Sequence, residues 1–235
     1  MGDSRTDWSG SKLAIIHTTP LTVEPLKSLA LAQMPGIEIV NLVDDSILPQ
    51  LAANGGSIQE VHGRWSEYAR IAERLGADCI LNACSSIGEL CAQVQPELAV
   101  PIVRIDEAVA EFAVGAASRI GVAATLATTL EPTQRQLRAK AEQAGKKVEL
   151  VSVVASTAYS MLLAGDKDGH DNELAETLRR LVSETDVVVL AQASMARVVE
   201  RFSPQERQRF LTSPELGMKR VAETIAAAVA MKQTK

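Results

Sequence analysis

The sequence predicts an α/β protein built from two similar halves, each a mainly parallel four-stranded sheet of flavodoxin-like type. Short β-rich apolar runs alternate with longer helical patterns along the chain, which is the order expected of βαβ units. Nearly half of the 235 residues are apolar but few are aromatic, and this composition suits buried parallel strands under Ala-rich helices. Two strand motifs also recur in the second half of the chain, which indicates a duplication.

The expected elements follow from the apolar periodicity. Strands are expected at residues 13–16, 37–43, 79–81, 102–105, 120–123, 148–154 and 187–190. Helices are expected at residues 23–33, 60–75, 106–114, 131–143, 173–184 and 214–231. This alternation predicts that most strands pair in parallel, with helices as the crossover connections.

The repeat sets the expected domain boundaries. Residues 12–18 resemble residues 119–125, and residues 78–84 resemble residues 186–192, at nearly the same offset. We therefore expect two halves related by a pseudo-two-fold axis, with the active site in the cleft between them. The expected divisions are a flexible leader at 1–11, a first domain of 12–114 with 214–235, and a second domain of 115–213.

The candidate binding residues lie where strands end, because ligands of open α/β sheets bind outside the carboxyl ends of the strands. Small hydroxyl and amide groups there can hold carboxylate or carbonyl oxygens. The alternative is that such groups only satisfy nearby backbone atoms. The expected substrate-binding residues are Thr18, Thr19, Asn82, Ser85, Ser86, Thr125, Thr128, Gln192, Ala193 and Ser194.

Cys84 is the expected catalytic residue. Ser86 and Glu89 have the spacing of a capping box, which predicts a helix beginning at Ser86. A thiol just ahead of a helix N-terminus is favoured as the thiolate, and the exposed N–H groups there can stabilise an oxyanion. The alternative is inert packing, which is the plain interpretation of Cys79 and Cys91.

Charge and composition exclude several classes of function. The net charge of −5 and the absence of a basic run argue against binding to nucleic acid. No apolar stretch is long enough to span a membrane. The N-terminus lacks the features of a signal peptide, and three cysteines without a pairing pattern indicate a reduced, cytoplasmic protein. No metal or cofactor is expected, since Asp44-Asp45 is interpreted as a turn or helix cap and no phosphate-binding loop is present.

Four short motifs are spread over nearly the whole length of the chain: Thr18-Thr19-Pro20, Ala83-Cys84-Ser85-Ser86, Gly121-Val122-Ala123-Ala124-Thr125 and Leu190-Ala191-Gln192-Ala193-Ser194-Met195. Together they resemble the aspartate/glutamate/hydantoin racemase superfamily. The motif around Cys84 is most similar to the maleate isomerase and arylmalonate decarboxylase branch. The resemblance implies a cofactor-independent enzyme acting on a small carboxylate of amino acid, hydantoin or dicarboxylate type, and a homo-oligomer.

The resemblance also implies two cysteines on opposite faces of the substrate. Cys84 matches the first, but Gln192 stands where the second is expected, and an amide does not exchange protons near neutral pH. One-cysteine chemistry is therefore expected, with an arylmalonate-decarboxylase-like lyase or a non-catalytic carboxylate-binding protein as alternatives. His17 and His62 remain possible replacements, while His170 is expected on a solvated loop.

Overall fold

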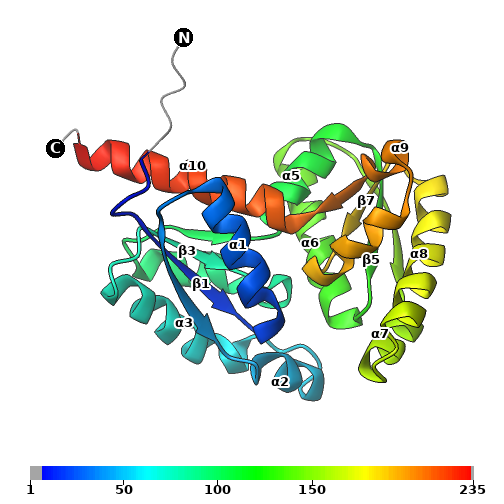
Figure 1. Ribbon diagram of the computed structural model, residues 1–235, viewed down its shortest axis with the longest axis horizontal. Helices are drawn as coiled ribbons and strands as arrows, with labels where there is room; N and C mark the ends of the chain where they lie inside the picture. Colours follow the sequence, from blue (N-terminus) through cyan, green and yellow to red (C-terminus); the bar gives the residue numbers. More distant parts are fainter. Residues whose placement is uncertain (1–6, 234–235) are drawn as a thin grey trace, which may run out of the picture. The chain divides into compact units, whose positions relative to one another are not determined.

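The computed structural model describes residues 7–233, without the side chains of residues 193, 194 and 231–233. The chain divides into unit 1, which extends to Ile105 and resumes at Pro214, and unit 2, Asp106–Ser213. Each unit contains one parallel four-stranded sheet with helices between the strands (Figure 1). The predicted fold class, two similar α/β halves, is confirmed.

Unit 1 has the strand order β2-β1-β3-β4. Its strands are β1 (Lys12–His17), β2 (Glu38–Val43), β3 (Cys79–Asn82) and β4 (Ile102–Arg104). Its helices are α1 (Val23–Gln33), α2 (Ile47–Ala53), α3 (Gln59–Arg74), α4 (Leu90–Val94) and α10 (Ser213–Gln233). Three 3-10 turns connect them, η1 (Pro20–Thr22), η2 (Ser85–Ile87) and η3 (Gln95–Glu97).

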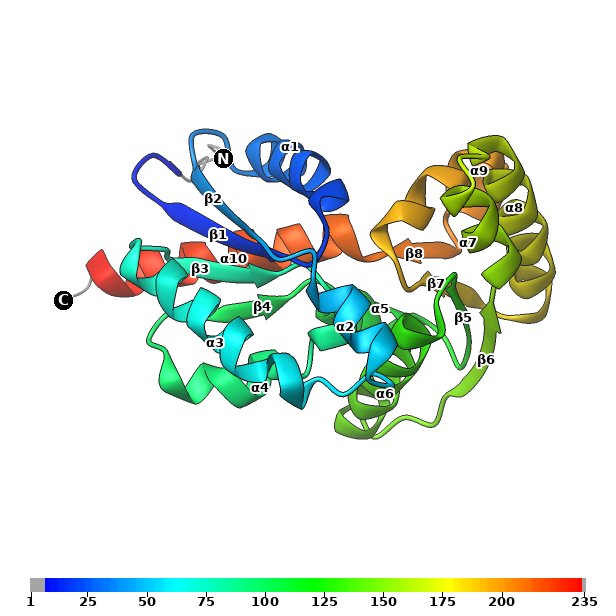
Figure 2. The same cartoon turned by 90° about the horizontal axis from the view of Figure 1, so that it is seen from below.

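The sheet of unit 1 is buried on both faces. Ala14 and Ile16 of β1 pack in the cluster that contains Trp65 of α3, while Leu13 and Ile15 pack with α1 and α10. Figure 2 shows α1 and α3 on opposite sides of the strands. Two covered faces explain why the central strands are unbroken apolar runs. In the expected leader, Trp8 packs into this core, whereas residues 1–6 lie outside the described residues.

Unit 2 repeats the topology with the strand order β6-β5-β7-β8. Its strands are β5 (Arg119–Ala124), β6 (Glu149–Val154), β7 (Val187–Leu190) and β8 (Phe210–Thr212). Its helices are α5 (Glu107–Ala116), α6 (Ala127–Gln143), α7 (Ser156–Leu163), α8 (Lys167–Glu184) and α9 (Pro204–Arg207), with the 3-10 helix η4 (Ala193–Arg201). Residues of α7, α8 and η4 cover one face of this sheet.

The first boundary falls before α5, whereas the sequence suggested a boundary after Val114. Lys140 of α6 contacts Glu107 at 2.5 Å and Glu111 at 2.8 Å, so α5 is held to unit 2 by two ion pairs as well as by helix packing. In the described part of the chain, no helix is long and apolar enough to cross a bilayer.

Candidate functional site

The thiol of Cys84 lies at the carboxyl edge of the first sheet. β1 and β3 pair in parallel with Ile16 opposite Asn82, so Thr18 and Cys84, two residues further along each strand, share one edge and one face. Cys84 is extended, with φ −134° and ψ 114°, and it precedes η2. Its side chain is buried, with only 8 % of the residue exposed.

Burial raises the pKa of the Cys84 thiol, although several donors act in the opposite direction. The hydroxyl of Thr18 stabilises the thiolate, and so do the backbone N–H groups of Ser86 and Ile87. Burial has the larger effect, so the thiol is protonated near neutral pH. The expectation that the local structure favours a resting thiolate is therefore wrong.

The predicted helix start at Ser86 is also wrong. Residues 85–87 form the 3-10 turn η2, and α4 begins only at Leu90 and spans five residues. Glu89 is the N-cap of α4 and its side chain makes no capping hydrogen bond. The donors that face the sulfur are therefore individual N–H groups of a tight turn, and not the end of a long helix with a large dipole.

Asn82 joins this group from β3. It is fully buried, and its Nδ2 donates to the carbonyl oxygen of Cys84 at 2.8 Å. Among the described residues its Oδ1 has no hydrogen-bond partner. A buried acceptor without a partner costs about 1–3 kcal/mol. Asn82 thus fixes the backbone of the thiol residue and leaves one oxygen able to accept from a bound molecule.

His17 supports the loop that carries Thr18. The ring is fully buried, and burial lowers its pKa, so it is neutral. Nε2 donates to Asn41 Oδ1 at 2.9 Å because an amide oxygen only accepts, and Nδ1 then pairs with the Thr22 hydroxyl at 2.8 Å. Both nitrogens are engaged inside unit 1, so His17 has the core role that the sequence left open.

Asp44 is the first residue after β2, the strand beside β1. Its Oδ1 accepts from the Ser46 N–H and hydroxyl, and its Oδ2 accepts from the Tyr68 hydroxyl and Arg64 Nε, both at 3.0 Å. Burial alone would raise the pKa of this carboxyl, but these hydrogen bonds and the charge of Arg64 hold it below its usual range. Asp44 and Ser46 therefore form a turn that ties α3 to the end of β2.

Gln192 occupies the equivalent place in unit 2. It is extended, with φ −132° and ψ 134°, and it precedes η4. Its Oε1 accepts from the backbone N–H of Thr125 at 2.7 Å and from the Thr125 hydroxyl at 2.9 Å. The structure thus brings together Thr18 with Cys84 in one unit and Thr125 with Gln192 in the other.

The remaining candidates have simpler surroundings. Thr19 is the N-cap of η1, where its hydroxyl accepts from Leu21 N–H at 3.4 Å. Thr128 is half-buried in the first turn of α6, and Ser85 is buried in η2. Ala193 and Ser194 begin η4, but their side chains lie outside the described residues. His62 is half-buried on α3.

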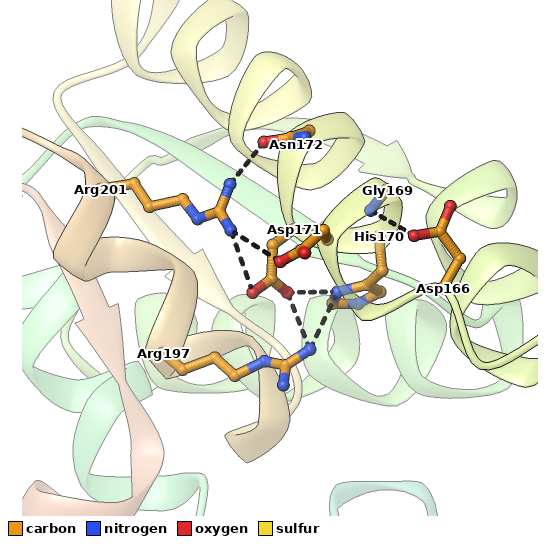
Figure 3. A network of polar contacts seen from close by, with 8 residues as sticks. Asp166, Gly169, His170, Asp171, Asn172, Arg197 and Arg201 are labelled. Atoms are coloured by element: carbon orange, nitrogen blue, oxygen red, sulfur yellow. Dashed lines mark hydrogen bonds and ion pairs between the residues drawn. The ribbon is translucent and has the colours of Figure 1, made fainter.

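His170 is buried in α8, so its predicted position on a solvated loop is wrong (Figure 3). Its Nδ1 lies 2.6 Å from Asp171 Oδ1, and Arg197 of η4 donates to the same oxygen at 2.8 Å. Arg201 contacts the other oxygen of Asp171 at 3.5 Å. The ion pairs of Arg197 and Arg201 with Asp171 hold η4, the segment that follows Gln192, against the start of α8.

One charged residue at the first site was not identified from the sequence. Arg104 is the last residue of β4 and pairs with Asn82 in the register of the sheet. The strand-end rule that selected the other candidates also applies to this strand, so the signal that could have identified Arg104 was present. Arg104 is partly buried at the same sheet edge as the thiol.

The comparisons with known proteins agree with this geometry. The sequence matches the Asp/Glu/Hydantoin racemase family over residues 14–231, while no curated protein matches significantly. A glutamate racemase from Bacillus anthracis has TM-score 0.70 and 16% identity, covering 92% of this chain and 82% of that one. An aspartate racemase homologue from Pyrococcus horikoshii has TM-score 0.66 and 17% identity, covering 92% and 99%.

An allantoin racemase from Klebsiella pneumoniae is also similar, with TM-score 0.62 and 19% identity, covering 92% of this chain and 88% of that one. At such identities the structural likeness concerns the fold. The family match covers nearly the whole sequence and both strand-end pairs described above. The chain therefore belongs to the Asp/Glu/hydantoin racemase family, a family of isomerase enzymes.

Proposed function

We propose that this chain is a cofactor-independent enzyme that acts through Cys84 on a small carboxylate of amino acid, hydantoin or dicarboxylate type. The observation that supports the proposal is the set of donors around one buried thiol, the Thr18 hydroxyl and the N–H groups of Ser86 and Ile87. These groups can stabilise a thiolate when it forms, and the same N–H groups can stabilise a developing enolate. The three cysteines of the chain are free thiols, which supports a cytoplasmic location. The family resemblance supports a homo-oligomer.

The chemistry uses one cysteine. Gln192 directs its Oε1 at Thr125, so only its NH₂ end remains to donate to a substrate oxygen. Such an amide can hold an oxygen but cannot deliver or remove a proton near neutral pH. Proton transfer at carbon is therefore assigned to Cys84 and occurs on one face of the substrate.

A lyase is the second candidate, and the raised pKa of Cys84 favours it. In this reaction the bond between the α-carbon and one carboxylate breaks, carbon dioxide leaves, and the electron pair forms an enolate. The α-carbon then takes the proton of the Cys84 thiol, and water returns a proton to the sulfur. A protonated thiol is the required starting state for this step, whereas proton abstraction requires the thiol to ionise first.

Deuterium exchange tests the proposal. Candidate amino acids, hydantoins, dicarboxylates and malonates are incubated in D₂O with the wild type, Cys84→Ala and the matched control Cys79→Ala. Burial raises the pKa of Cys79 to about 12, so this thiol is expected to be inert. We expect label at the α-carbon with wild type and with Cys79→Ala, and a loss of at least about 10²-fold with Cys84→Ala, the scale of one acid–base group.

The stereochemistry of the product separates the alternatives. Label with retained configuration supports one-sided transfer, and label after loss of carbon dioxide supports the lyase. Label with inversion contradicts one-cysteine chemistry. Cis–trans isomerisation of a dicarboxylate without label indicates that Cys84 adds to the double bond as a nucleophile. If the Cys84→Ala variant still binds one of the candidate acids and the wild type turns over none of them, the chain is a carboxylate-binding protein and the proposal is overturned.

A further inference from the structure

Arg104 lies on the same face of the sheet as the thiol. Ile80 pairs with Ile102, and Asn82 pairs with Arg104. Ile80 and Cys84 belong to one apolar cluster, against which Ile102 also packs. Because side chains alternate along a strand, Arg104 projects to this face together with Asn82. A guanidinium is thus placed at the carboxyl edge of β4, beside the strand that leads into Cys84.

The turn that follows Cys84 contains a glycine, Gly88, at the point where the Arg104 side chain contacts it. Gly88 follows η2, and its N–H donates to the carbonyl of Ser85 at 3.1 Å. A Cβ at Gly88 would lie 2.6 Å from both Nε and Cζ of Arg104, which is closer than real Cβ atoms come. The guanidinium therefore rests directly against the backbone of the turn that supplies the donors of the Cys84 site.

Asn82 completes the group of polar atoms. It is fully buried, its Nδ2 is engaged by the Cys84 carbonyl, and its Oδ1 has no partner within the part of the chain that the structure describes. The edge thus combines an acceptor, a cation and a thiol. An acceptor beside a cation recognises a molecule that carries an N–H group next to a carboxylate.

We propose that Arg104 is the specificity-determining residue that binds the substrate carboxylate at the Cys84 site, with Asn82 Oδ1 accepting from an N–H group of the same molecule. The inference rests on the proposed function and assigns it a substrate class, an anionic carboxylate with an adjacent N–H. Arg104 makes at least one further polar or ionic interaction within the chain. A guanidinium has five N–H donors, and a carboxylate that binds side-on accepts from two of them.

Two alkylating reagents of similar size test the proposal without any turnover. Iodoacetate carries a carboxylate and iodoacetamide is its neutral counterpart, and both react with the same thiolate. The ratio of their rates at Cys84, normalised to free cysteine, is therefore independent of the thiol pKa. We expect the ratio to fall about tenfold in Arg104→Gln, the effect of one hydrogen bond between charged groups. Peptide mass spectrometry measures the modification of each cysteine separately.

Three variants act as controls. Arg74→Gln removes the same charge from the exposed Arg74–Glu67 pair on α3, so its ratio is expected to stay at the wild-type value. Arg104→Lys keeps the charge without the planar fork and is expected to give an intermediate ratio. Gly88→Ala displaces the guanidinium without removing it and is expected to lower the ratio. Because Gly88→Ala retains Arg104, it keeps the test valid if Arg104→Gln does not fold.

An unchanged ratio in both Arg104→Gln and Gly88→Ala overturns the inference. An equal fall in Arg74→Gln overturns it as well, because the effect would then be one of net charge. Failure of iodoacetate to modify Cys84 in the wild type also overturns it, since no carboxylate would reach the thiol. These outcomes leave the deuterium-exchange result untouched, so failure of this inference is distinguishable from failure of the proposed function.

Discussion

The two units end their third strands with the same backbone but with different chemistry. Cys84 and Gln192 are both extended residues that precede a 3-10 turn. Each also receives the hydroxyl of a threonine from the end of the first strand, Thr18 in one unit and Thr125 in the other. The backbone and the threonine are thus common to both, and the difference lies in the acceptor, a thiol in unit 1 and an amide in unit 2.

The two units thus share the donor, a threonine hydroxyl, and differ in the side chain that accepts from it. A buried thiol can exchange a proton, whereas an amide held by two hydrogen bonds can only donate from its remaining end. The proposed function therefore assigns proton transfer to the first site and substrate binding to the second. Three predictions test how far the equivalence of the two units extends.

The largest expected effect concerns the packing of the first strand in each unit. Ala14 of β1 corresponds to Gly121 of β5 in the repeat. A Cβ at Gly121 would lie 2.9 Å from Leu181 and 3.0 Å from Thr185, so α8 packs closely against this strand. We expect Gly121→Ala to lower the free energy of unfolding by about 1–3 kcal/mol through overpacking.

Urea unfolding measures this change, and Ala14→Gly is the matched control. Ala14 is fully buried in β1, and its replacement by glycine is expected to cost about 0.5–1 kcal/mol because glycine loses more backbone entropy on folding. If Gly121→Ala is as stable as the wild type, α8 can move away from the sheet and the glycine is not required by the packing of unit 2.

Most of the fold was predictable because its central strands are buried on both faces. β1, β3, β5 and β7 are continuous apolar runs, and such runs are visible in the sequence. β8 was missed because only two of its three residues, Phe210 and Leu211, are apolar, and polar residues flank them. β4 is equally short, but its apolar pattern continues to Ile105. The offset of 108 residues that relates β3 to β7 also relates β4 to β8, so the repeat contained the missing strand.

The site was predictable as a set of positions but not as an electrostatic environment. The strand-end rule identified Thr18, Cys84, Thr125 and Gln192, and the structure brings them together as two pairs. The raised pKa of Cys84 depends on burial by helices that are distant in sequence. His170 was misplaced for the same reason. The polar residues on either side of it in the sequence suggested an exposed loop, whereas Arg197 of η4, which is distant in the sequence, contacts His170 and Asp171 in the structure.

The second prediction exchanges the accepting group in unit 2. In Gln192→Cys, the introduced thiol would have the extended backbone of Cys84 and the hydroxyl of Thr125 nearby. Gln192 is only partly buried, so desolvation opposes the thiolate less than it does at Cys84. We expect iodoacetamide at pH 7 to modify the introduced thiol about tenfold faster than Cys84, because the thiolate is the reacting form and is less opposed by burial at position 192.

Peptide mass spectrometry compares both thiols in the same sample, so no difference in protein preparation enters. Gln192→Cys combined with Thr125→Val is the control, because valine removes the hydroxyl donor and is expected to slow the modification of the introduced thiol. A thiol at position 192 that reacts no faster than Cys84 would show that burial does not distinguish the two units.

The smallest expected effect concerns acid stability. His17 of β1 corresponds to Ala124 of β5, so only unit 1 has a buried imidazole at this place. Burial lowers the pKa of His17 in the folded state, while the unfolded chain titrates near the ordinary value of 6.5. Below pH 6.5 the unfolded state therefore binds a proton that the folded state does not. Stability is full above this pH and falls as the pH decreases toward the folded pKa.

The slope of this loss is at most about 1.4 kcal/mol per pH unit, the contribution of one proton. Hydrogen exchange between pH 7.5 and 5.5, corrected for the intrinsic rate, is expected to show opening of residues 18–22 but not of the equivalent residues after β5. His17→Gln keeps a neutral side chain, so its urea unfolding curve should depend less on pH than that of the wild type. Equal acid sensitivity of the two loops would show that the imidazole does not control the segment carrying Thr18, and that this part of the two units behaves alike despite the different residues.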